Sequence, residues 1–212
     1  MSNKTQLQTN NTNLDALITR VNAAKDVAAS LPEAGGGGDD VGALLSNALT
    51  EIDSNITSVI DYACRGCSAL TTVNLPEVTK IGTYGFHSCS NIASFNAPKV
   101  KTLGSYVLYG CKKLTEVNFP LATSVPSNCF YQATALVKAD FGAASSIDTY
   151  GFIYCSALRT LILRKTDSIC TLANTSNCFS SSGVASGKAY IYVPKALIDT
   201  YKTATNWSSY AS

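Results

Sequence analysis

Eight cysteines are the side chains of this sequence most suited to chemistry. Cys64 and Cys67 have the Cys-x-x-Cys spacing that occurs in zinc and redox sites. A structural zinc site takes four ligands, yet no second pair with this spacing follows, and His87 is the only histidine. The sequence therefore predicts no metal and no other cofactor, and we expect free thiols that pack as small apolar side chains. A metal or redox role is the alternative.

Nucleophilic catalysis has no convincing set of residues either. A nucleophile needs a base beside it, and the single histidine belongs to no catalytic motif. Residues 183–188 are similar to a phosphate-binding loop, but the segment is one residue short, and Ala189 stands where that motif has serine or threonine. The sequence predicts that the protein is not an enzyme.

The cysteines lie on a 22-residue repeat. Cys67, Cys89 and Cys111 follow one another at this interval, Ala133 takes the next position, and Cys155 resumes the series. Stacked coils would hold these side chains in parallel, which is poor geometry for a disulfide. The same interval links four more columns: Leu70, Ile92, Leu114, Leu136 and Leu158; Val59, Ile81, Leu103, Val125, Ile147 and Ile169; Tyr62, Tyr84, Tyr106, Asn128 and Tyr150; and Phe86, Leu108, Phe130 and Phe152.

Each repeat contains a short strand pattern. Leu70-x-x-Val73-x-Leu75 alternates apolar and polar positions, and Pro76 follows, where a missing N–H ends the ladder. A single coil cannot bury its apolar face, whereas stacked neighbours can. We therefore predict a β-rich repeat solenoid with a 22-residue period and a parallel sheet over residues 41–188, including an N-terminal cap.

These motifs resemble the BspA-like (Treponema-type) leucine-rich-repeat family. Its pattern of Leu-x-x-Val-x-Leu-Pro followed by Ile-x-x-Tyr-Ala-Phe-x-x-Cys is visible at residues 70–89 and extends over roughly 49–194. Departures include Ala133 for cysteine and Gly142 for proline, and Cys178 falls one place past the expected position. Many relatives of this repeat are bacterial surface proteins, so the resemblance implies a binding scaffold.

Residues 189–212 predict a last strand and a capping helix. Pro194 suits a helix start, and the apolar positions after it keep helical spacing. A partner-binding helix is the alternative to a cap. The expected apolar positions are Leu197, Ile198, Tyr201, Ala204 and Trp207.

Residues 1–34 predict a separate N-terminal helix. Nearly four heptads indicate a coiled coil and a homo-oligomer. The glycine-rich hinge at 35–40 favours a helix that works away from the solenoid. A helix docked on the solenoid is the alternative. The seam positions are Leu7, Asn10, Leu14, Leu17, Val21, Ala24, Ala28 and Leu31.

Charge and hydropathy limit the kinds of partner that we expect this protein to have. The net charge of +2 without a basic cluster predicts no nucleic-acid binding. No stretch reaches the roughly 18 apolar residues of a membrane span, so we expect no membrane insertion. The first residues also lack the apolar core of a secretory signal peptide, which predicts synthesis in the bacterial cytoplasm without a signal peptide.

The outward positions of the strands form a candidate binding face. Their amides and hydroxyls suit a sugar or an extended peptide, although a column of asparagines can also satisfy itself by hydrogen bonds between coils. The candidate face comprises Thr72, Asn74, Ser94, Asn96, Glu116, Asn118, Lys138, Asp140, Arg159 and Thr160.

Residues 1–38 resemble an attachment module of phage and prophage structural proteins from gut Firmicutes. That resemblance implies a bacteriophage fibre or decoration protein, located in the virion beside other virion proteins, whose solenoid adheres to a host-surface glycan or protein. The analogy to phage fibres, and not the heptads, favours a trimer of the N-terminal helix. The alternative is a bacterial cell-surface leucine-rich-repeat adhesin.

Overall fold

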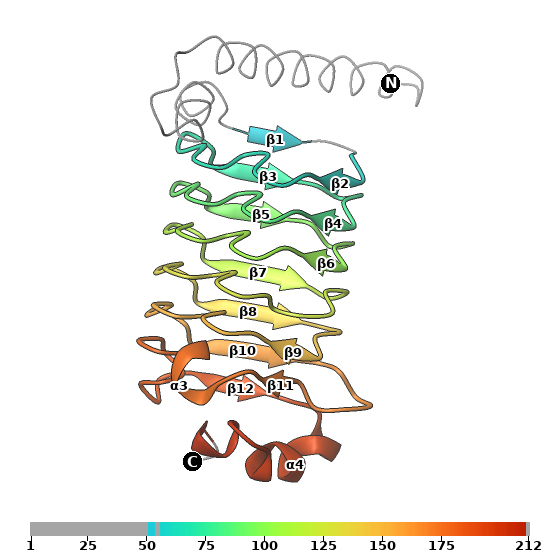
Figure 1. Ribbon diagram of the computed structural model, residues 1–212, viewed down its shortest axis with the longest axis vertical. Coiled ribbons are helices and arrows are strands. Elements are labelled where there is room, and N and C mark those ends of the chain that lie inside the picture. Colours follow the sequence, from blue (N-terminus) through green and yellow to red (C-terminus); the bar gives the residue numbers. More distant parts are fainter. Residues whose placement is uncertain (1–50, 54–55, 211–212) are drawn as a thin grey trace.

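A stack of parallel coils forms the body of the protein (Figure 1). The computed structural model describes residues 51–53 and 56–210 of the 212-residue chain. The strands pair in parallel from coil to coil, which confirms the predicted solenoid. The expected N-terminal helix, the glycine hinge and the first residues of the predicted cap lie outside the described residues.

One side of the stack carries a broad row of strands. Figure 1 shows these strands side by side, from β1 near one end of the stack to β12 near the other. Hydrogen-bonded pairing divides them into the sheets β1-β3-β5 and β12-β10-β8-β7. Their bounds are β1 Glu51–Asp53, β3 Thr72–Asn74, β5 Ser94–Asn96, β7 Glu116–Phe119, β8 Lys138–Phe141, β10 Thr160–Leu163 and β12 Tyr190–Tyr192.

A second, narrower row of strands runs along another side of the coils. It comprises the sheets β2-β4-β6 and β11-β9, and a bridge between Val125 and Ile147 continues the row between them. The strands are β2 Ser58–Val59, β4 Lys80–Ile81, β6 Thr102–Leu103, β9 Ser146–Ile147 and β11 Thr171–Leu172.

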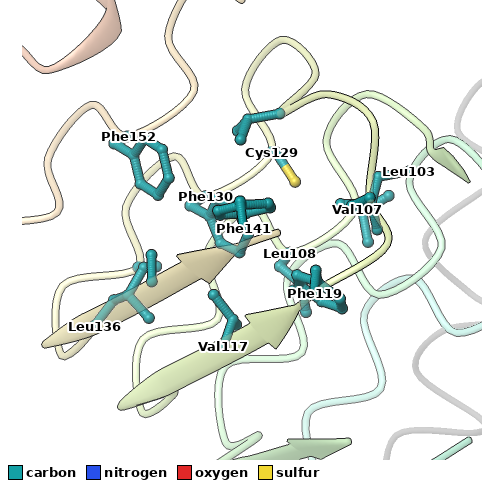
Figure 2. Packing of buried hydrophobic residues seen from close by; sticks show 14 of the residues in the cluster. Leu103, Val107, Leu108, Val117, Phe119, Cys129, Phe130, Leu136, Phe141 and Phe152 are labelled. Carbon is teal, nitrogen blue, oxygen red and sulfur yellow. The ribbon is translucent and has the colours of Figure 1, made fainter. Parts of the chain in front are cut away.

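The core lies inside the coils. Strand pairs such as Thr72 with Ser94 confirm the 22-residue offset. All five side chains of the column from Leu70 to Leu158 are fully buried. Figure 2 shows Phe130, Phe141 and Phe152 grouped in this interior with the Cys129 sulfur. Each coil buries its apolar side chains against its neighbours, so stability is a sum over adjacent coils.

Two positions of each coil adopt left-handed backbone angles. Such a residue costs roughly 1–2 kcal/mol unless it is glycine or asparagine. One column holds Tyr62, Tyr84, Tyr106, Asn128 and Tyr150, with φ between 58° and 65°. The other holds Gly66, Ser88, Gly110, Gln132 and Tyr154, with φ between 59° and 76°.

The last coil departs from the repeat. Ser146 pairs with Thr171, slightly later in the chain than the repeat interval predicts. Thr160 pairs with Tyr190, which lies much later than predicted. The predicted register is wrong after Leu163, because extra residues are accommodated before β11 and again before β12.

As a result, two of the predicted columns continue into the last coil with a different residue from the one expected. Leu172, not Ile169, pairs with Ile147. Ser182 takes the cysteine position, because its N–H donates to Phe179 as the N–H of Cys155 donates to Phe152. Cys178, at the end of the short helix α3 (Thr175–Cys178), belongs to another column.

The C-terminal cap closes the end of the stack. Tyr201 and Trp207 are buried against the core. The N–H of Cys170 donates to the Tyr201 hydroxyl at 2.7 Å, and the Trp207 indole donates to the Cys170 carbonyl. Asn206 donates its amide to the Leu172 carbonyl at 2.8 Å. These side chains give the backbone of β11 the hydrogen-bond partners that a further coil would have supplied.

The cap is less regular than the sequence predicted. A 3₁₀ turn, η1 (Lys195–Leu197), precedes the helix α4 (Ile198–Thr203), and a second turn, η2 (Ser208–Tyr210), follows it. The predicted capping helix is present as α4 but is shorter than expected, because Ala204 is extended and ends it. This break places Trp207 under the stack, while Ile198 stays 37% exposed.

Candidate binding surfaces

Two rows of outward side chains cross the broad strand row, and together we call them the strand face. Alternation along each strand buries the residues between the rows, such as Val73, Val117 and Leu161. The first row is Thr72, Ser94, Glu116, Lys138, Thr160 and Tyr190, and the second is Asn74, Asn96, Asn118, Asp140, Ile162 and Tyr192.

Part of the second row is internally bonded. The Asn96 amide donates to the Asn74 Oδ1 at 2.7 Å. Asp140, expected to be an exposed binding residue, is buried and accepts two hydrogen bonds from Arg164, at 2.9 Å to Oδ1 and 2.6 Å to Oδ2. This carboxylate raises the pKa of Arg164. Asp140 therefore anchors a neighbouring coil, because a two-point ion pair occupies both of its oxygens.

Arg159 is the second correction to the predicted face. It precedes β10, and its Nη1 donates to the carbonyls of Ser156 and Leu158, at 3.1 Å and 3.0 Å. These bonds hold the guanidinium at the corner of the coil instead of on the strand face. The predicted residues that the structure exposes together on that face are Ser94, Asn96, Glu116, Asn118 and Lys138, with Thr72, Asn74 and Thr160 half-buried.

Tyr190 and Tyr192 end the two rows and were missed in the sequence. Their side chains are 73% and 55% exposed. β12 is also the edge strand of its sheet. The alternation of Tyr190, Ile191 and Tyr192 was the available signal, since it places both rings on the outer side of a strand.

A different side of the coils carries stacked aromatic rings. Tyr84 lies between Tyr62 and Tyr106 with ring centroids 4.9 Å and 4.6 Å away, and nearly parallel planes. His87 begins a second stack on Tyr109, at 4.5 Å. Ring faces inside these stacks cover one another, so they offer a ligand mostly edges and hydroxyl groups. Both stacks stabilise the coils, and the first offsets the left-handed strain of its tyrosines.

The cysteines line the interior. All eight are free thiols, and seven are buried. The Cys155 sulfur donates to the Phe130 carbonyl at 3.1 Å, and the Cys111 sulfur to the Phe86 carbonyl at 3.4 Å. Burial raises the pKa of both thiols, which keeps them protonated and unreactive at neutral pH.

Residues 51–53 and 56–210 hold no group of three or more histidine, cysteine or acidic side chains arranged to bind a metal ion. Over the same ranges, the helices are too short or too polar to span a lipid bilayer.

Comparison with known proteins identifies the repeat. The family model described as the BspA type leucine rich repeat region matches residues 45–185 in six copies. No curated protein sequence matches the chain. The match covers most of the sequence and agrees with the 22-residue stack of parallel strands. The chain belongs to the BspA-type leucine-rich-repeat family.

Proposed function

We propose that the protein is a non-enzymatic adhesive module that presents its strand face to a surface glycan or protein. The observation that carries the proposal is the strand face itself. Ser94, Asn96, Glu116, Asn118 and Lys138 are exposed on β5, β7 and β8, each of which pairs with a parallel neighbour. A paired backbone that holds a hydroxyl, two amides, a carboxylate and an ammonium group in fixed order loses little conformational freedom on binding, which favours affinity.

The two terminal tyrosines strengthen this proposal. Tyr190 and Tyr192 present exposed rings on an edge strand, beside the half-buried Ile162. Rings of this kind supply a large contact area at low entropic cost, and they are enriched where proteins bind partners. We expect them to be the strongest contact of the strand face.

Binding of labelled protein to bacterial cells and immobilised surface glycans tests the adhesive role. The variant carrying Tyr190→Ser and Tyr192→Ser should lose at least tenfold in apparent affinity, because both exposed rings are removed. Tyr150→Asn is the matched control, since it removes an exposed tyrosine from the turn side and asparagine occupies the same position in Asn128. Equal loss in both variants would contradict a role for the strand face.

A place in a bacteriophage virion is the finer proposal. Its support is the resemblance of residues 1–38 to a phage attachment module, together with a solenoid suited to display. Mass spectrometry of purified particles and of cell-wall fractions from the producing bacterium distinguishes the candidates. Enrichment in particles supports a fibre or decoration protein, and enrichment in the cell wall supports a bacterial surface adhesin.

The proposed assembly is a homo-oligomer, with a trimer favoured, formed by the seam from Leu7 to Leu31. Sedimentation of the full chain and of a chain beginning at Gly38 tests it. The full chain should sediment as an oligomer and the shorter chain as a monomer. If both chains sediment as monomers at tens of micromolar protein, the proposed coiled coil is contradicted.

A further inference from the structure

A hollow of about 380 Å³ opens in the last coil. Ser156 contributes from the preceding coil, and the loop between α3 and β12 supplies the other residues around it. We call this feature the serine hollow. Its lining is Ser156, Ser181, Ser182, Ala185, Ser186 and Lys188.

The serine hollow is formed by a loop that is longer than the repeat allows. The loop belongs to the coil whose strand pair, Thr160 with Tyr190, is separated by more than the repeat interval that joins the regular strands. Gly183 ties this longer loop to the preceding coil, because its N–H donates to the Cys155 carbonyl at 3.1 Å and a Cβ there would lie 1.6 Å from the Leu158 oxygen. Ser156, Ser181 and Ser186 are exposed beside this tether, whereas Ser182 takes the buried cysteine position.

Hydrogen bonds fix the shape of the loop. The Ser182 hydroxyl accepts the N–H of Ala185 at 3.3 Å, and the Ser186 hydroxyl donates to the Gly183 carbonyl at 3.1 Å. The N–H of Lys188 donates to the same carbonyl at 2.9 Å. These bonds order the loop and the Ser186 hydroxyl before any ligand arrives, which lowers the entropic cost of binding.

Lys188 is the one charged residue of the lining. Residues 148–199 contain five lysines and arginines and three aspartates, Asp148, Asp167 and Asp199. Lys165 pairs with Asp167, and Arg164 pairs with Asp140. Among the described residues, neither ion pair reaches the hollow, where Lys188 forms part of the lining.

Arg159 adds a second cation at the rim. Its Nη1 donates to the carbonyl of Ser156, one of the lining residues. An anionic ligand seated against Lys188 would therefore also feel the guanidinium charge. Charge-assisted bonds of this type are the stronger class of hydrogen bond.

We propose that the serine hollow binds an acidic monosaccharide unit, with its carboxylate on Lys188 and its hydroxyls on the exposed Ser156, Ser181 and Ser186. The volume lies in the range of about 300–1,000 Å³ that ligand sites occupy, and it exceeds what a lone inorganic anion fills. Serine hydroxyls donate and accept, so they match sugar hydroxyls. This inference is independent of the proposed adhesive role, because it concerns the hollow and not the strand face.

Titration calorimetry of the full-length protein with glucuronate, glucose and inorganic sulfate tests the inference. Glucuronate should bind, whereas glucose and sulfate should each bind at least fivefold more weakly. Lys188→Gln should weaken glucuronate binding at least fivefold. Lys195→Gln is the matched control, because it removes a nearby charge that is not part of the lining, and its affinity should match that of the wild type.

Three results would overturn the proposal. Glucose binding as tightly as glucuronate would remove the role of the charge, and sulfate binding as tightly would remove the role of the sugar. Unchanged glucuronate affinity in Lys188→Gln would show that glucuronate binds at another place. The Tyr190 and Tyr192 double variant keeps the hollow, so its glucuronate affinity should stay unchanged whatever the adhesion assay shows.

Discussion

The regular coils and the last coil differ in how closely they keep the repeat interval and in which side chains they bury. Up to β10, the paired strands keep the 22-residue offset, and leucine, phenylalanine and tyrosine columns run through the stack. In the last coil the offsets lengthen, a polar hollow opens, and Tyr190 and Tyr192 stay exposed. Repetition stabilises the regular coils, and departure from repetition frees side chains that can contact a ligand.

The largest expected effect is the loss of a leucine in the regular stack. Leu114 is fully buried in the middle of its column, so Leu114→Ala should lower the free energy of unfolding by about 2–5 kcal/mol. Ile191→Ala, at a half-buried position of β12, should cost clearly less. Denaturant melts measure both variants, and equal losses would remove the contrast between the two regions.

The next largest loss of stability is expected from a glycine substitution. A Cβ on Gly104 would lie 2.4 Å from the Thr83 nitrogen in the neighbouring coil, whereas a Cβ on Gly187 meets nothing within 4 Å. Gly104→Ala should cost about 1–3 kcal/mol through overpacking. Gly187→Ala should cost only about 1 kcal/mol, from its φ of +67°. Thermal melts should therefore rank Gly104→Ala as less stable, and the reverse order would show that the coils tolerate separation.

Alkaline pH should weaken the regular stack through its thiols. Burial raises the pKa of Cys155, so the folded state keeps the proton above about pH 8.5 while the unfolded chain releases it. The stabilisation is complete below that pH and falls by about 1.4 kcal/mol per pH unit above it.

The Cys155→Ala variant isolates this contribution. Alanine fits the position, as Ala133 shows one coil earlier. Between about pH 9 and 11, the variant should lose stability less steeply than the wild type, by about 1.4 kcal/mol per pH unit. Parallel slopes in urea melts would show that the Cys155 thiol ionises in the folded protein.

Sequence alone predicted the regular coils well, because their information is periodic. The strand from Leu70 to Leu75 and the columns of buried side chains follow from a single interval. The last coil could not be predicted in this way, since Leu172 and Ser182 replace the expected Ile169 and Cys178 only after the insertions are placed in space.

The candidate site was predicted only in part. The repeat spacing correctly predicted that Asn96 and Asn118 are exposed in one row, because strand alternation decides which side chains point outward. It could not show that Arg164, which lies in the next coil, reaches back and pairs with Asp140. It also missed the exposure of Tyr190, which depends on β12 being the edge of its sheet.

Native-state hydrogen exchange tests most directly the division between a stable regular stack and a more open last coil. Amides of β8 should exchange only through global unfolding, because this strand lies between its paired neighbours β7 and β10. Amides of residues 165–169 should exchange at least a hundredfold faster, because they lie in the inserted loop before β11. Uniform protection from β3 to β12, including this loop, would contradict the division.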